Sequence, residues 1–264
     1  MPLKAFVCPD DPWTWRTITD CRACAEPCFG ALEVVETLWY NTFGTEHHYH
    51  DDPKVISVTE SLGCLSMAWF KKKREYAETP KSLMARTNGT NTHGMYEAGT
   101  IDGDGDSGRH AEGYHCEVPL DPIDLSHGYT FRGTVDRVTP DAIKDYKSCD
   151  NPTKSLGGPK RRMDDGTKRH VHAEQLSVYA DALGHEGRLE VVQVGRRDAA
   201  THQAPRVENA LLWAKERAET LIVALEADDV DRLDKEGVDI LYYRACACNF
   251  CPFRLECGPN LEDG

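Results

Sequence analysis

The middle of the chain most constrains the fold, because it reads as two strands around a tight turn. Residues 129–139 (YTFRGTVDRVT) are rich in β-branched and aromatic side chains, and residues 142–149 (AIKDYKSC) follow the turn pair Pro140-Asp141. Strand-like runs separated by such a turn predict an antiparallel hairpin. This is the most strand-like region of the chain, so we expect the fold to be organised around a sheet.

Helical and strand-like patterns alternate on both sides of the hairpin. Ser57-Val58-Thr59-Glu60 matches a capping box, so a helix is expected to begin there, carry Cys64 in its first turns and end near residues 71–74. The other expected helices cover 31–40, 82–98, 170–183 and 205–227, and the other expected strands cover 115–120 and 188–195. This order predicts an α/β fold with a mixed central sheet flanked by helices.

The first part of the chain differs in composition from the rest. Residues 1–30 are rich in Cys, Pro and Trp and show little periodicity, so they are expected to form a loop-built module. The polar stretch 44–53 contains three histidines and ends at Pro53, as a linker would. We therefore divide the chain into a cysteine-rich N-terminal module with its linker (1–52) and a main domain (53–264).

Acidic residues outnumber basic residues. The chain has 31 Lys and Arg against 44 Asp and Glu, a formal net charge of −13. This argues against a general nucleic-acid coat protein, since phosphate contacts need Lys and Arg, but not against an enzyme that meets DNA through bound cations and local basic patches. No apolar run approaches the length of a membrane span and the N-terminus lacks the apolar core of a secretory signal, so a cytoplasmic protein without membrane contact is expected.

The predicted hairpin brings two carboxylates and a lysine together. Asp145 and Lys147 are two residues apart in a strand and project from the same face, and Asp136 lies on the partner strand, where the hairpin can bring it close to Asp145. Carboxylates at one point repel unless a cation joins them, and hard oxygen ligands suit Mg²⁺ or Mn²⁺. The alternative is a solvated Asp–Lys pair on the polar face of a half-buried strand.

Four short motifs follow one another along the chain. They are Gly89-Thr90-Asn91-Thr92-His93, Gly133-Thr134-Val135-Asp136, Asp145-Tyr146-Lys147 and Gln175-Leu176-Ser177-Val178-Tyr179. In this order they resemble the successive motifs of RecB-like nucleases of the PD-(D/E)XK superfamily. The resemblance spans residues 55–258 and implies a restriction-endonuclease-like core.

The resemblance also implies a role for each of these residues. A divalent metal ion, Mg²⁺ or Mn²⁺, would be held by His93, Asp136, Asp145 and the backbone carbonyl of Tyr146. Asp136, Asp145 and Lys147 would form the catalytic set, with Lys147 orienting or deprotonating the attacking water. Gln175 and Tyr179, which share one helix face at i, i+4 spacing, would contact DNA.

The C-terminal cysteines indicate a second kind of metal site. Cys248, Cys251 and Cys257 have the spacing C-x₂-C-x₅-C, and three thiolates need a fourth ligand to close a cluster or a tetrahedral site. One distant cysteine, here Cys64, with three C-terminal ones resembles the iron–sulfur pattern of CRISPR-associated RecB-like exonucleases and of the AddB helicase–nuclease. This resemblance implies a 4Fe–4S cluster that ties the start of the main domain to its end, while Zn²⁺ on the same ligands remains an alternative. Cys246 is either a bystander or a competing ligand.

A second group of cysteines lies near the N-terminus. Cys8, Cys21, Cys24 and Cys28 include one C-x₂-C pair, which suits a structural Zn²⁺ site, with free thiols as the alternative. This group rests on spacing alone. Residues 116 and 149 are single cysteines in predicted strands and are expected to be small buried hydrophobes.

Basic residues gather after the catalytic strand. The loop expected over residues 150–168 includes Lys160, Arg161 and Arg162 and adjoins Lys147 in sequence, so we expect contacts with the DNA backbone there. By resemblance, the chain is a DNA exonuclease acting on single-stranded ends, 5′ to 3′, in recombination, viral DNA metabolism or CRISPR spacer processing, with recombination or CRISPR adaptation proteins as partners. Competing hypotheses are a non-catalytic, metal-stabilised DNA-binding or assembly subunit and an iron–sulfur electron carrier.

Overall fold

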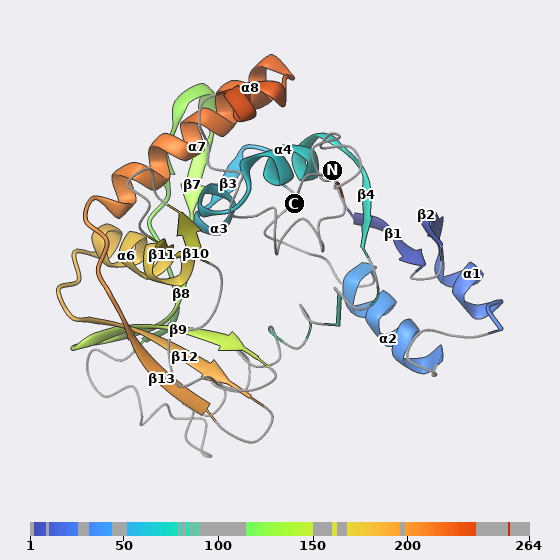
Figure 1. Cartoon of the computed structure of the whole chain (residues 1–264), viewed down its shortest axis with the longest axis horizontal. Coiled ribbons are helices and arrows are strands. Elements are labelled where there is room, and N and C mark those ends of the chain that lie inside the picture. The colour runs from blue at the N-terminus through green and yellow to red at the C-terminus, as the bar shows by residue number, and fades with distance from the viewer. Residues whose placement is uncertain are drawn as a thin grey trace.

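The computed structural model describes residues 3–8, 11–25, 32–43, 52–78, 80, 83–84, 87, 89, 115–149, 160–162, 168–195, 199–235 and 253. A five-stranded mixed sheet forms the centre of the main domain (Figure 1). Its order is β13 (Ala199–Ala204), β12 (Arg188–Val194), β9 (Ala142–Ser148), β8 (Thr134–Thr139) and β5 (His115–Pro119). β12 is parallel to β9 and the other neighbours are antiparallel, so the expected hairpin and the expected mixed sheet are confirmed.

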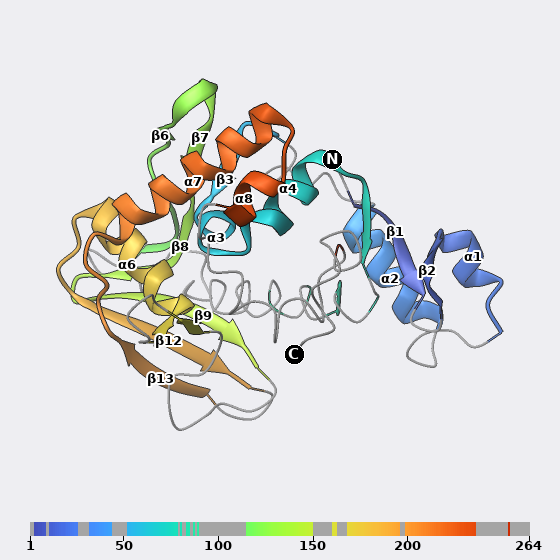
Figure 2. The ribbon, with the colours of Figure 1, turned by 45° about the horizontal axis from the view of Figure 1, so that its top comes forward.

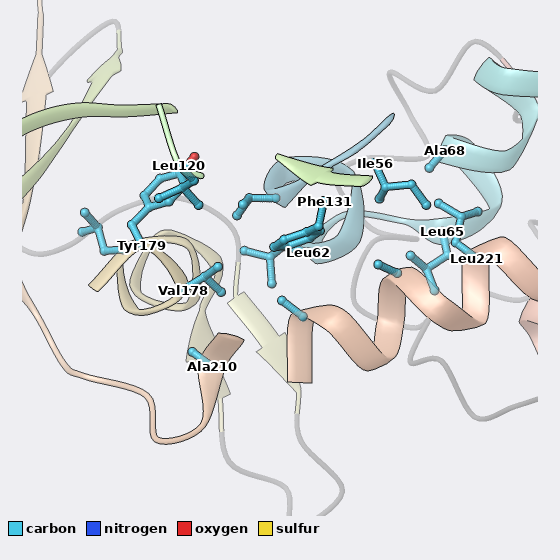
Figure 3. Close-up of a cluster of buried hydrophobic side chains, with 14 of the residues drawn as sticks. Ile56, Leu62, Leu65, Ala68, Leu120, Phe131, Val178, Tyr179, Ala210 and Leu221 are labelled. Atoms are coloured by element: carbon cyan, nitrogen blue, oxygen red, sulfur yellow. The ribbon is translucent and has the colours of Figure 1, made fainter. Parts of the chain in front are cut away.

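Two long helices lie on one side of this sheet. α6 (Val171–Leu183) contacts β9 and β12, and α7 (Ala210–Ala227) packs against α6 and α3 (Val58–Leu62). Ala210, Ala214 and Ala218 recur every four residues on α7 and are fully buried, which lets its neighbours approach closely. Figure 3 shows part of the resulting core, where Val178 of α6 and Leu221 of α7 belong to the same cluster as Leu62, Leu65 and Phe131.

Glycine 133 divides the long strand that was expected over residues 129–139. β7 (Thr130–Arg132) pairs with β3 (Val55–Ser57) and β6 (Ile123–Asp124) in a separate sheet, and β8 belongs to the central one. A Cβ at Gly133 would lie 2.7 Å from Val58 Cγ2 and 2.9 Å from Tyr179 Cε1. The absence of a side chain therefore permits the close approach at which the chain passes from one sheet to the other.

The capping box at Ser57 begins a helix as expected, but that helix is short. In α3 (Val58–Leu62) the Glu60 carboxylate accepts from the Ser57 amide at 2.8 Å and the Ser57 hydroxyl accepts from the Glu60 amide at 3.1 Å. A second helix, α4 (Leu65–Lys73), follows with Cys64 as its N-cap, so the prediction of one continuous helix was wrong.

Arg217 of α7 stabilises the break between α3 and α4. Its Nε donates to the carbonyl of Ser61 at 2.6 Å, and its Nη2 donates to the carbonyl of Gly63 at 2.8 Å. These carbonyls lie where a helix end leaves acceptors without intrahelical donors. Arg217 is itself buried, so a tertiary contact that no local pattern reveals fixes the position of Cys64.

The N-terminal part contains regular structure, which contradicts the expectation of a loop-built module. β1 (Leu3–Cys8) and β2 (Asp11–Arg16) form an antiparallel pair, followed by α1 (Ile18–Arg22) and α2 (Leu32–Phe43). β1 also pairs in parallel with β4 (Tyr76–Glu78) of the main domain. Figures 1 and 2 both show these elements to one side of the main domain. The division at residue 52 remains a prediction.

A small hairpin replaces part of the loop expected over residues 150–168. β10 (Lys160–Arg162) pairs antiparallel with β11 (Lys168–His170), directly before α6. The remaining elements are a short 3-10 turn, η2 (Ser126–Gly128), and α8 (Asp231–Lys235). Most of the helix expected over 82–98, including His93, lies outside the described residues. None of the helices in the described part of the chain has the length and apolar character needed to cross a bilayer.

Candidate active site

Two aspartates face each other at the junction of β8 and β9. The strands pair at Arg137–Lys144 and Val138–Ile143, and continuing this register by one residue places Asp136 opposite Asp145. The ladder ends there, because the amide of Tyr146 donates to Asp136 Oδ2 at 2.6 Å. A side-chain carboxylate thus replaces a main-chain acceptor, and the strands separate at the point where the acidic residues lie.

Asp145 and Lys147 form an ion pair on one face of β9. Lys147 Nζ lies 2.8 Å from Asp145 Oδ1, and the side chains are 30% and 2% exposed, respectively. Burial opposes the charge of Lys147, but the charge and hydrogen bond of Asp145, together with Asp136, raise the pKa of the amine above its usual value. The protonated amine donates hydrogen bonds and cannot accept a proton, so this geometry favours water orientation over water deprotonation.

The second oxygen of Asp145 is the clearest sign of a ligand. Asp145 Oδ2 is buried and has no hydrogen-bond partner among the described residues. A buried carboxylate oxygen without a partner is costly, and a cation relieves that cost. The donor types therefore suit Mg²⁺ or Mn²⁺. Within the described ranges no three His, Cys, Asp or Glu side chains converge on one point, and His93 lies outside them.

Helix α6 places Gln175 and Tyr179 beside the carboxylates. Gln175 Nε2 donates to Tyr179 Oη at 3.2 Å, as their i, i+4 spacing allows. Burial raises the pKa of the Tyr179 phenol well above its usual range, and the negative charges of Asp145 and Asp136 raise it further. The hydrogen bond with Gln175 opposes this shift without cancelling it. The phenol is therefore neutral at physiological pH, and this face of α6 looks onto the same space as the two aspartates.

The upstream motif approaches the same strand. A Cβ at Gly89 would lie 3.7 Å from the hydroxyl of Ser148, which follows Lys147 at the end of β9. The first glycine of the His93 motif is therefore adjacent to the candidate site. His93 itself lies outside the described residues.

Sequence reasoning missed two polar residues that face this site. Glu117 lies opposite Asp136 in the register of β5 and β8, has a left-handed φ of 47°, and its charge also raises the pKa of Tyr179. His172 lies three residues before Gln175 and therefore on the same face of α6. The i−3 spacing could have indicated His172, whereas Glu117 is revealed only by the sheet register.

The basic residues after β9 lie in a two-stranded ribbon. Arg161 pairs with Arg169 and Arg162 with Lys168, while Lys160 pairs with His170, the N-cap of α6. The backbone register thus brings basic positions of both strands together, and contacts with phosphate need Lys and Arg. The ribbon leads directly into the helix that carries Gln175 and Tyr179.

The described cysteines do not form a metal centre by themselves. Cys8, Cys21 and Cys64 are partly buried and Cys24 is exposed. Cys28, Cys248, Cys251 and Cys257 lie outside the described residues, as does Cys246. Cys116 and Cys149 are only partly buried, so the expectation that they are buried was wrong. Cys116 lies in β5, an edge strand of the sheet, and Cys149 directly follows the end of β9; other residues cover both positions incompletely.

Phe253 is the one residue among the C-terminal cysteines that the structure describes. It lies between Cys251 and Cys257 in sequence, is 1% exposed, and stacks on Phe70 of α4 with ring centroids 5.1 Å apart. Its ring also lies 5.4 Å from that of Tyr76. Phe253 therefore contacts the helix whose N-cap is Cys64.

Comparisons with known proteins bear on the family and the fold of the chain. A family model for the PD-(D/E)XK nuclease superfamily matches residues 33–258. The crystal structure of SSO0001 is similar in fold, with a TM-score of 0.50 and 16% sequence identity over 86% of this chain and 94% of that one. No curated protein matches the chain significantly.

Proposed function

Because the chain belongs to the PD-(D/E)XK nuclease superfamily, we propose that it is a metal-dependent deoxyribonuclease that hydrolyses phosphodiester bonds at single-stranded DNA ends. The observation that carries the proposal is the buried Oδ2 atom of Asp145, which has no hydrogen-bond partner among the described residues. It lies beside Asp136 and the ammonium group of Lys147. A purely structural ion pair has no need of an open carboxylate oxygen in a buried position.

The metal ligands that we propose are Asp136, Asp145, the backbone carbonyl of Tyr146 and His93. A divalent cation held by these ligands would polarise the scissile phosphate and lower the pKa of a water molecule. Asp136 Oδ2 already accepts the Tyr146 amide, which fixes this carboxylate against β9. Mg²⁺ and Mn²⁺ are the proposed ions, because the donor set is dominated by hard oxygen atoms.

The other residues of the site act on the substrate. Lys147 places a positive charge where negative charge develops on the phosphate, and it orients the attacking water by donating a hydrogen bond. Gln175 and Tyr179 contact the DNA strand, and the neutral Tyr179 hydroxyl remains a donor because it accepts from Gln175. Lys160, Arg161 and Arg162 contact the DNA backbone along the basic ribbon.

The substrate preference and setting follow from the motif resemblance. We propose an exonuclease of the RecB-like type that degrades single strands 5′ to 3′ in the cytoplasm. Recombination, viral DNA metabolism and CRISPR spacer processing are the settings of such enzymes, and recombination or CRISPR adaptation proteins are the corresponding partners.

We also propose that Cys64, Cys248, Cys251 and Cys257 hold a 4Fe–4S cluster. The stacking of Phe253 on Phe70 supports this, because Phe253 lies between Cys251 and Cys257 in sequence and Phe70 belongs to α4, whose N-cap is Cys64. Such a cluster closes a loop of most of the main domain and so stabilises the fold. Anaerobically purified protein should be brown and contain iron and acid-labile sulfide, whereas colourless protein with zinc alone would refute the cluster but leave the nuclease proposal intact.

The N-terminal cysteines are a separate proposal. Cys8, Cys21, Cys24 and Cys28 would hold a structural Zn²⁺ in the module formed by residues 1–52. Metal analysis of the Cys24→Ser variant tests this, because loss of one zinc per chain is expected. Unchanged zinc content would show that these thiols are free.

The decisive experiment is cleavage of end-labelled single-stranded DNA with Mg²⁺, Mn²⁺ or EDTA. Lys147→Ala should lower the metal-dependent rate by about 10²–10³-fold, as removal of one preorganised charge does in other enzymes. Lys144→Ala is the matched control, because Lys144 lies on the other face of β9 and pairs with Glu190 at 2.8 Å. No cleavage of single strands, duplexes or flaps by folded, metal-loaded protein would favour the binding-subunit hypothesis.

A further inference from the structure

Three polar residues line one face of α6, and one of them has no assigned role. His172, Gln175 and Tyr179 are separated by three and four residues, so they project from the same side of the helix. Tyr179 is 4% exposed, while Gln175 and His172 are partly buried and lie toward the helix N-terminus. The row thus leads from the buried part of the site toward the β10–β11 ribbon.

His172 faces charged groups of the candidate active site. Its pKa is lowered to about 4, chiefly by burial and also by the charges of Lys147 and His170, while the charge of Asp145 opposes this shift. The ring is therefore neutral near pH 7 and offers one N–H donor and one acceptor. Its proximity to Lys147 favours an anionic ligand over a cationic one.

The Nδ1 atom of the His172 ring forms no hydrogen bond within the described part of the chain. This nitrogen is buried and has no partner there. The orientation and tautomer of a histidine are set by its hydrogen bonds, so a ring without such a bond can turn toward an incoming acceptor. A buried polar atom without a partner is also costly, and a ligand that engages the ring relieves this cost.

We propose that His172 donates an N–H hydrogen bond to a phosphate of the bound DNA strand, between Lys147 and the β10–β11 ribbon. The proposal rests on the proposed nuclease function and adds a substrate contact to Gln175 and Tyr179. A phosphate at this position lies near the Lys147 ammonium, which compensates its charge. The contact uses the N–H that the neutral ring already offers and does not require a charged imidazole.

The test measures binding separately from cleavage. A fluorescein-labelled single-stranded oligonucleotide is titrated with the full-length protein in Ca²⁺, used as a cation that supports binding without turnover, and anisotropy gives the Kd. His172→Ala should raise the Kd about tenfold, the usual effect of losing a hydrogen bond to a charged group. His172→Asn retains an N–H group and should bind within about threefold of wild type. In steady-state cleavage, His172→Ala should raise KM more than it lowers kcat.

His202 provides a matched control. Its Nε2 is likewise buried without a hydrogen-bond partner in the described part of the chain, but it lies on β13 at the edge of the sheet. His202→Ala should therefore bind the oligonucleotide as wild type does. If His202→Ala weakens binding as much as His172→Ala, the loss is a general effect of removing a buried ring and the inference is wrong.

The remaining outcomes are also decisive. If the wild-type protein binds DNA and His172→Ala binds it with the same Kd, this contact is refuted and the nuclease proposal still stands. A wild type that binds no DNA refutes the nuclease proposal and this inference with it. If His172→Ala does not fold, the ring signals of His172 in NMR spectra of the wild type, identified through His172→Asn, should shift when oligonucleotide is added; unshifted signals would refute the contact.

Discussion

The two faces of β9 carry similar lysine–carboxylate pairs with different surroundings. On one face Lys147 pairs with Asp145 at 2.8 Å, and on the other Lys144 pairs with Glu190 at 2.8 Å. The two lysine side chains are 30% and 29% exposed, so exposure of the cation does not distinguish the pairs. The carboxylates differ: Glu190 also contacts Arg188 at 3.3 Å, whereas Asp145 keeps a buried oxygen with no hydrogen-bond partner in the described part of the chain.

This contrast shows what separates a site from a structural ion pair. A lysine and a carboxylate at suitable spacing occur on both faces of one strand, so residue type alone is insufficient. The Lys144–Glu190–Arg188 group satisfies its own charges at the sheet surface. The Asp145–Lys147 pair leaves one acceptor open in a place that water scarcely reaches, and only that face opens toward α6.

The largest expected effect comes from neutralising each carboxylate in turn. Asp145→Asn should lower the cleavage rate by about 10³-fold or more, because a proposed metal ligand and the partner of Lys147 are both lost. Glu190→Gln should leave the rate unchanged and cost about 0.2–1 kcal/mol of unfolding free energy, as for other partly exposed pairs. Rates on labelled single strands and urea denaturation measure both quantities. Equal loss of activity in the two variants would remove the distinction between the faces.

A smaller loss of cleavage rate is expected when a side chain is added at Gly133, which lies against Tyr179 of the candidate active site. In Gly133→Ala the new Cβ must displace Val58 or Tyr179, which would lie 2.7 and 2.9 Å away. Overpacking of this kind costs about 1–3 kcal/mol of unfolding free energy. Displacement of Tyr179 should lower the cleavage rate about ten- to a hundredfold.

Gly128→Ala is the control for this experiment. Its φ is 73° and a Cβ there meets no atom within 4 Å, so only backbone strain of about 1 kcal/mol is expected, with no change in rate. If Gly133→Ala cleaves at the wild-type rate, the position of Tyr179 does not matter for activity.

The pH dependence of stability should also differ between the faces. The pKa of His172 in the folded chain is lowered from 6.5 to about 4, so between these pH values the unfolded chain binds a proton that the folded chain does not. Stability should therefore fall as the pH drops through this window, by about 1.4 kcal/mol per pH unit at most. The groups facing the ring are Lys147, Asp145 and His170.

Urea denaturation of His172→Leu at both ends of that window measures this effect. The variant should lose less stability on acidification than the wild type, because its side chain does not titrate. The same loss in both proteins would mean that His172 titrates in the folded chain as it does in the unfolded chain.

The smallest effect is expected from Tyr146→Phe. The Tyr146 side chain lies on the face away from Asp145, and its hydroxyl is 3.5 Å from Arg137 Nη1, a long hydrogen bond. The proposed role of Tyr146 belongs to its backbone carbonyl, which this change retains. Cleavage within about twofold of wild type and a stability loss below about 1 kcal/mol are expected. A large loss of activity would mean that a functional contact lies on the face of β9 away from Asp145, which contradicts the distinction between the two faces.

The hairpin and its charged residues could be predicted because local patterns encode them. Alternation around Pro140-Asp141 indicates both strands, and the i, i+2 spacing of Asp145 and Lys147 fixes their common face. The i, i+4 spacing of Gln175 and Tyr179 does the same on α6. These relations depend on the period of a strand or a helix and on little else.

Other features depend on contacts between distant segments. The strand β13 (AATHQA) has few β-branched residues and forms because it pairs along its whole length with β12. The break at Cys64 depends on Arg217, and the β10–β11 ribbon has a sequence typical of a solvated loop. Glu117 joins the site only through the register of β5 with β8, which no periodicity specifies.

The short strand β4 contacts both β1 near the start of the chain and Phe253 far along it. It hydrogen-bonds to β1 through the Tyr76–Leu3 and Glu78–Phe6 pairings, and the ring of Tyr76 lies against Phe253. Detachment of β1 or of Phe253 therefore removes one of the contacts that hold β4, so we expect their opening to be coupled through this strand. In hydrogen exchange the amides of β4 should act as a common reporter for both ends, and a chain trimmed at its N-terminus would present an uncovered strand edge open to self-association.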